Sequence, residues 1–203
     1  MPTLTPMAMG TSKPMGTTVA DVDGDGDMDI IDGIDDLVTV DEQQGGMFGS
    51  NRAQAQWFRG TVDSGRFETT PRVIGDGLGS LPTVMDIDGD GDLDVASAEY
   101  FHPSGSFAWF ERTTNPSAEN PSGTWVRHVI DDTVGPSINL GFVEDLFGDG
   151  VTRAIGSNHS NTAKASPDPW DSALFVYDIP TGDALRSPWA GVQITTGIVS
   201  VPG

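Results

Sequence analysis

The stretch Ala20-Asp-Val-Asp-Gly-Asp-Gly-Asp-Met-Asp-Ile30 is the most informative part of the chain. It recurs as Met85-Asp-Ile-Asp-Gly-Asp-Gly-Asp-Leu-Asp-Val95. A weaker copy follows as Glu144-Asp-Leu-Phe-Gly-Asp-Gly-Val-Thr-Arg-Ala154. Five aspartates within nine residues repel one another unless a cation lies among them, and calcium takes oxygen ligands of this kind. The pattern therefore predicts a metal-binding loop that is present twice in full.

The spacing of the aspartates matches a calcium loop with oxygen ligands at positions 1, 3, 5, 7 and 9 and glycine at position 6. The ligand at position 7 is normally a backbone carbonyl, so Asp27 is expected to bind through its main chain. Glycine is expected at position 6 because the chain must turn sharply there, often with positive φ. Calcium suits this flexible loop better than magnesium, which demands a strict octahedron. The predicted metal ligands are Asp21, Asp23, Asp25, Asp27, Asp29, Asp86, Asp88, Asp90, Asp92 and Asp94.

The flanks of these loops differ from a helix–loop–helix site. Position 12 is Asp32 in the first copy and Ser97 in the second, where a bidentate glutamate is usual. The residues after each loop, Met28-Asp-Ile-Ile31 and Leu93-Asp-Val-Ala96, are typical of the start of a strand. A strand–loop–strand site is therefore predicted.

The third loop, Asp145 to Arg153, is degenerate. Asp145, Asp149 and Gly150 keep positions 1, 5 and 6, but Phe147 and Arg153 replace the aspartates of positions 3 and 9. Two acidic ligands are lost and a cation is added, which offsets the remaining carboxylates. We expect no tight calcium site there.

Composition excludes several function classes. The chain of 203 residues has 10 basic and 30 acidic side chains, a formal net charge of −20. Such a charge argues against binding to nucleic acid or to an anionic membrane surface. Cysteine is absent, so there is no disulfide framework, and no apolar run is long enough to span a membrane. The first residues lack the features of a secretory signal peptide.

Other features repeat in step with the loops, which start 65 (86 − 21) and 59 (145 − 86) residues apart. A short β run precedes each loop and another follows it. An aromatic strand comes next, such as Gln56-Trp-Phe-Arg59 or Phe107-Ala-Trp-Phe-Glu111, and then a fourth strand. The chain is thus predicted to be all-β, with no helix and about three units of four antiparallel strands, at residues 16–76, 80–132 and 138–197.

Tandem units of four strands are typical of β-propeller blades. The D-x-D-G-D-G-D-x-D loops followed by aromatic strands resemble FG-GAP/VCBS repeats, the calcium-binding propeller repeats of integrin α-subunits. The resemblance implies that each metal loop joins the innermost strand of a blade to the second. It also implies a ring of roughly seven blades. Further blades of the same protein, or self-association through the open edges, would then complete the ring.

The resemblance implies a function as well. We expect a secreted or extracellular module that binds a glycan or protein ligand, with calcium as a structural ion. The alternative is the propeller domain of a metal-dependent carbohydrate-active enzyme, a polysaccharide lyase or a sugar dehydratase.

Candidate ligand-binding residues lie in the connections between second and third strands, at the rim opposite the metal loops. Two of these connections, residues 35–55 and 158–172, are long, and long loops are often functional. Glu99, His102 and His159 are the candidates for a catalytic or second metal site. The alternative interpretation is that they are ordinary polar loop residues. Further candidates for ligand contact are Tyr100, Asn158 and Trp170, whereas Trp57, Trp109 and His128 are expected to be structural.

Overall fold

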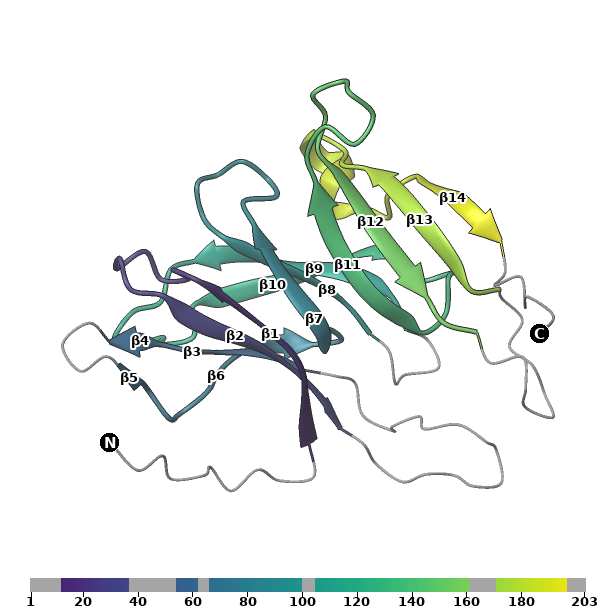
Figure 1. Ribbon diagram of the computed structural model, residues 1–203. Helices are drawn as coiled ribbons and strands as arrows, with labels where there is room; N and C mark the ends of the chain where they lie inside the picture. Colours follow the sequence, from purple (N-terminus) through teal and green to yellow (C-terminus); the bar gives the residue numbers. More distant parts are fainter. Residues whose placement is uncertain (1–11, 37–53, 62–65, 100–104, 161–170, 197–203) are drawn as a thin grey trace, which may run out of the picture.

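The computed structural model describes residues 12–36, 54–61, 66–99, 105–160 and 171–196. Three four-stranded antiparallel sheets make up this part of the chain, and they pack against one another in the order of the sequence (Figure 1). The all-β fold and the four-stranded unit predicted from the sequence are confirmed. The described residues do not show the closure of a ring.

Each sheet is a run of hairpins. Sheet 1 has the order β1 (Ser12–Ala20), β2 (Asp29–Asp36), β3 (Gln54–Phe58) and β6 (Arg72–Asp76). Sheet 2 has the order β7 (Ser80–Met85), β8 (Asp94–Ala98), β9 (Phe107–Thr114) and β10 (Thr124–Asp131). Sheet 3 has the order β11 (Ser137–Val143), β12 (Arg153–Asn158), β13 (Ala173–Asp178) and β14 (Gly191–Thr196).

Two small elements interrupt this repeat. A two-stranded hairpin, β4 (Gly60–Thr61) and β5 (Arg66–Phe67), lies between β3 and β6. A short 3-10 helix, η1 (Gly182–Arg186), lies between β13 and β14. The sequence prediction of no helix missed η1. Within the ranges that the structure describes, no helix is long and apolar enough to cross a membrane.

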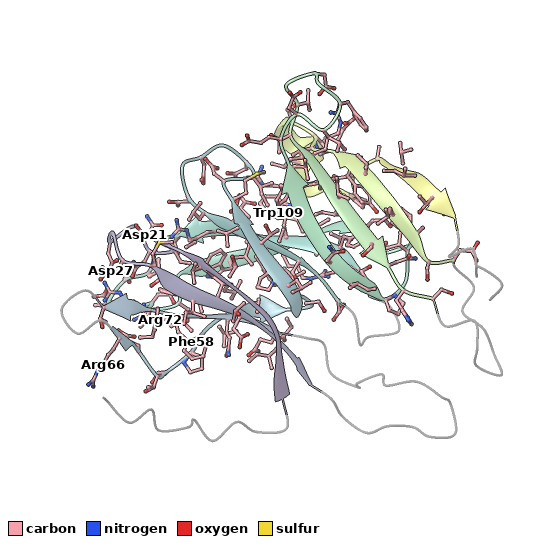
Figure 2. All side chains as sticks on the ribbon, in the orientation of Figure 1. Asp21, Asp27, Phe58, Arg66, Arg72 and Trp109 are labelled. Carbon is pink, nitrogen blue, oxygen red and sulfur yellow. The ribbon has the colours of Figure 1, made fainter. Side chains whose placement is uncertain are left out.

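The first strands of the sheets, β1, β7 and β11, lie beside one another, and the interior is divided into two apolar clusters. The cluster between sheets 1 and 2 contains Ile31, Trp57 and Phe110. The cluster between sheets 2 and 3 contains Trp109, Phe107 and residues of β13 (Figure 2). Both tryptophans are fully buried and hold the same register, Trp57 opposite Ile31 and Trp109 opposite Ala96. They are therefore structural residues, as expected.

Candidate metal loops

The acidic loops occupy the same place in each sheet, between the first and second strands, and they project along one edge of the molecule (Figure 1). Gly24 and Gly26 have φ of 75° and 92°, and Gly89 and Gly91 have φ of 78° and 95°. Left-handed backbone of this kind favours glycine. The positive φ expected at position 6 is confirmed, and position 4 requires it as well.

Each complete loop gathers three carboxylates whose oxygens could hold a metal ion. Asp21, Asp23 and Asp29 form the first triad, and Asp86, Asp88 and Asp94 form the second. Within each triad, one oxygen from every member lies within 4.8 Å of the others. The triads consist of positions 1, 3 and 9 of the motif. Hard carboxylate oxygens in this number suit a divalent cation such as calcium.

The aspartate at position 9 also ties the loop to a residue in or just after the third strand of its sheet. Asp29 accepts the N–H of Val22 at 2.8 Å and that of Gly60 at 2.7 Å, one on each oxygen. Asp94 accepts the N–H of Ile87 at 2.9 Å and that of Arg112 at 3.0 Å in the same way. Both carboxylates are buried, so each loop is held in shape by its own candidate ligand.

The first triad has oxygens that lack a protein partner. Oδ1 of Asp21 and Oδ1 of Asp23 are buried and accept no hydrogen bond in the part of the chain that the structure describes. Buried polar atoms are ordinarily satisfied, so unmatched oxygens need an explanation. A cation at the triad would supply the missing contact. The residues present therefore fit a metal ion.

Both triads contain carboxyl groups whose pKa is raised. Burial above all, with the nearby charges of Asp88 and Asp90, raises the pKa of Asp94 to about 7. Burial likewise raises the pKa of Asp29 and of Asp88. A bound cation would favour the charged form of these carboxylates and reverse the shifts.

The other predicted ligands, Asp25, Asp27, Asp90 and Asp92, lie outside the triads. Asp25 accepts the N–H of Asp27 at 2.9 Å, and Asp90 accepts that of Asp92 at 2.8 Å. The backbone hydrogen bond from Asp27 is the main cause that lowers the pKa of Asp25, assisted by Arg59. In the structure these residues shape the turn, and their role as metal ligands stays a prediction.

Among the residues that the structure describes, three arginines contact the complete loops, and sequence analysis did not identify them as part of the site. Arg59 lies 2.7 Å from Asp23 and 2.5 Å from Asp25. Arg112, which is 4% exposed, bonds the carbonyl of Val22 in the first loop and Oδ1 of Asp92 in the second, the latter at 3.0 Å. Arg186 of η1 bonds Asp88 at 3.1 Å. Their position in the sequence was the available signal, because Arg59 ends the first aromatic segment and Arg112 directly follows the second.

Arginine also occupies the third loop. Arg153 stands at position 9 and binds Asp149 through two contacts, at 2.9 and 2.7 Å, and Asp178 through a third at 2.7 Å. Its hydrogen bonds to Asp149 lower the pKa of that carboxyl to about 2. Arg153 thus pairs with Asp149, one of the remaining carboxylates of this loop. The weakness of this loop as a calcium site stays a prediction.

The candidates at the opposite rim are described only in part. Tyr100, His102 and Trp170, with most of both long loops, lie outside the described residues. Glu99 is fully buried and its backbone bonds Ser106 and Ser137, each at 3.0 Å. The backbone N–H of His159 donates to the carbonyl of Pro136 at 2.8 Å. Glu99 and His159 therefore flank the same short segment, and their chemistry stays untested.

Asn158 and His128 both have structural contacts. The Asn158 amide donates to the carbonyls of Val134 and Asp171, at 2.7 and 2.9 Å, and accepts the N–H of Ala173 at 2.7 Å. These bonds hold the end of β12 to its neighbours. His128 packs on Trp109, with ring centroids 4.8 Å apart, and lies 2.7 Å from Glu111.

Comparison with protein-family models, with curated proteins and with solved structures found no match for this chain. The function must therefore be argued from the site itself.

Proposed function

We propose that the two complete acidic loops bind calcium as a structural ion. The observation that carries the proposal is the repetition of one triad at positions 1, 3 and 9, with the same glycine conformations, in two sheets. Three carboxylates, together with backbone carbonyls and water, can provide the six to eight oxygens that calcium takes. Because the triads form only in the folded chain, the binding free energy adds to the stability of the fold.

The test is thermal unfolding with calcium and with EDTA. At a free calcium concentration 100 times the Kd, one site adds about 2.7 kcal/mol, which corresponds to a rise in Tm of roughly 5–10 °C for a chain of this size. Asp21→Asn and Asp86→Asn should each remove part of the rise, because asparagine keeps an oxygen for the loop N–H groups but loses the charge. Asp149→Asn in the third loop is the control. An unchanged Tm in EDTA would falsify the proposal.

We also propose that the sheets are blades of an FG-GAP/VCBS-type propeller that serves as an extracellular binding module for a glycan or protein. Support comes from the sequential four-stranded sheets and from apolar side chains exposed on sheet 3. Leu174, Val192 and Ile194 are 44%, 67% and 53% exposed, as expected of a sheet on which another would pack. Light scattering tests the assembly. A defined oligomer would mean that copies of the chain complete a ring, whereas a monomer would rule out that route.

A further inference from the structure

A pocket of about 370 Å³ lies beside the first acidic loop, between sheets 1 and 2. One side is formed by Asp23, Arg59 and Arg72, and the other by the turn between β9 and β10, with Pro116, Ser117 and Pro121. Hydrogen bonds within the turn fix its shape, since Ser117 and Asn120 bond each other through their backbones at 2.9 Å. Two of the ten basic residues of this very acidic chain therefore line one pocket.

The two arginines are held in different ways. Arg72 is fixed, because it donates to Glu68 at 2.7 Å and to the carbonyl of Pro121 at 3.1 Å, and its guanidinium lies 4.6 Å from the centre of the Trp57 ring. Arg59 is the more exposed, with 36% of its side chain accessible. Within the described ranges, its ion pairs are with Asp23, a member of the first triad, and with Asp25.

The junction between sheets 2 and 3 shows which residue stands at the position of Arg59 in the second sheet. Glu111 occupies the place of Arg59, because Phe58 pairs with Ile30 in sheet 1 as Phe110 pairs with Val95 in sheet 2. Arg186 of η1, which follows β13 as the pocket turn follows β9, reaches back across this junction. It bonds Glu111 at 2.8 Å and Asp88 at 3.1 Å. An anionic side chain at this junction is thus neutralised by a cation from the neighbouring sheet.

The charge at the first junction is inverted. Arg59 replaces Glu111, and the facing turn, residues 115–123, carries only one acidic side chain, Glu119, which contacts Ser117 at 3.3 Å. Among the described residues, the cation of Arg59 is therefore matched by carboxylates of the same loop that the proposed metal would occupy. A metal at the triad would lie next to Arg59 and repel it, which weakens its ion pairs with Asp23 and Asp25.

We propose that this pocket binds the carboxylate or sulfate group of a ligand through Arg59, and that calcium in the first loop promotes this binding by releasing Arg59 from Asp23 and Asp25. A guanidinium presents five N–H donors in a planar fork that matches an oxyanion. Arg72 lies on the same side of the pocket, with its charge shared with Glu68. In the wild type the proposal rests on the proposed function, because Arg59 and Arg72 are paired with carboxylates and a bound metal would release Arg59.

The experiment is an NMR titration of the full chain that follows the Nε–H resonances of the arginines. The probes are sodium sulfate, kept below the solubility limit of calcium sulfate, and sodium acetate, with sodium chloride at equal ionic strength as the control. In calcium-loaded protein, we expect a saturable shift of the Arg59 resonance with sulfate or acetate but not with chloride. The probe that binds with the lower Kd identifies the preferred class of anion.

Three variants separate the pocket from the metal. Arg59→Gln should weaken binding at least tenfold, whereas Arg66→Gln, which removes an exposed arginine outside the pocket (Figure 2), should bind as the wild type does. Asp25→Asn removes one partner of Arg59 without touching the triad, so it should bind the anion without calcium more tightly than the wild type. If Asp25→Asn binds the anion and the Tm is insensitive to EDTA, the metal proposal is contradicted but the pocket proposal is not. Anion binding that is absent in Asp25→Asn and in calcium-loaded wild type, or unchanged in Arg59→Gln, would overturn the pocket proposal.

Discussion

Arg112 contacts both complete acidic loops. Its side chain bonds the carbonyl of Val22 in the first loop and the carboxylate of Asp92 in the second, and its own N–H bonds Asp94. The ring of Trp125 lies 6.0 Å from its guanidinium. A buried cation with these contacts orders both loops at once.

Replacing Arg112 by methionine keeps the apolar stem but removes every side-chain donor. Because the carbonyl of Val22 and the carboxylate of Asp92 lose a charged partner, we expect a loss of about 2–3 kcal/mol in the free energy of unfolding. Urea denaturation measures it. Arg66→Met is the matched control and should change stability by no more than about 0.5 kcal/mol. Equal stability of the two variants would contradict this role for Arg112.

Glu111 gives a prediction about pH. The hydrogen bond from Arg186 above all, and also the contact with His128, lowers the pKa of Glu111 from its ordinary value of 4.5. A carboxylate whose pKa is lowered by folding contributes stability above its unfolded pKa and loses that contribution as the pH falls through the folded value. Wild type should therefore be more stable than Glu111→Gln at pH 6, and the difference should shrink as the pH falls below about 4.5. A difference that stays constant down to pH 3 would refute the assignment.

At the scale of the elements, close contact between sheets 2 and 3 depends on glycine. A Cβ built on Gly156 of β12 would come within 2.5 Å of the Phe107 ring of β9, whereas one built on Gly141 of β11 would meet nothing within 4 Å. Gly156→Ala should therefore cost about 1–3 kcal/mol by overpacking. Gly141→Ala is the control and should be neutral or slightly stabilising. The two variants can be compared by thermal unfolding, and a neutral Gly156→Ala would show that the sheets can move apart.

Strand positions could be predicted from the sequence because alternation and aromatic residues mark them locally. The aromatic strand of the second unit, for example, is predicted at Phe107–Glu111 and observed at Phe107–Thr114. The hairpin β4–β5 and the helix η1 could not be predicted, because each has only a few residues and no periodic pattern.

For the site, the spacing of the aspartates located the loops, and the three positions that form each carboxylate triad were among the predicted ligands. The arginines that bind those loops come from other sheets or from strand ends, and such contacts depend on tertiary packing rather than on local pattern.

At the scale of the whole molecule, the formal charge of −20 acts against folding through self-repulsion. Raising the ionic strength from 0.01 to 0.15 M shortens the Debye length from about 30 to about 8 Å, so we expect the Tm of the calcium-free protein to rise with sodium chloride. Two bound calcium ions would bring the net charge to −20 + 4 = −16. The Tm of the calcium-loaded protein should therefore rise less with sodium chloride. A calcium-free Tm that falls with salt would mean that the arginine ion pairs outweigh the repulsion.

The opposite charges at the two sheet junctions have a consequence for the fidelity of folding. Tandem repeats are prone to misassembly, in which a unit docks on the wrong neighbour or exchanges strands with another chain. If sheet 3 docked on sheet 1, Arg186 would meet Arg59 instead of Glu111, and like charges would face each other. We therefore expect the junctions to discriminate between correct and incorrect neighbours, as charge patterns do between binding partners. Glu111→Arg should lower the yield of correctly refolded protein, and an unchanged yield would show that the discrimination lies elsewhere.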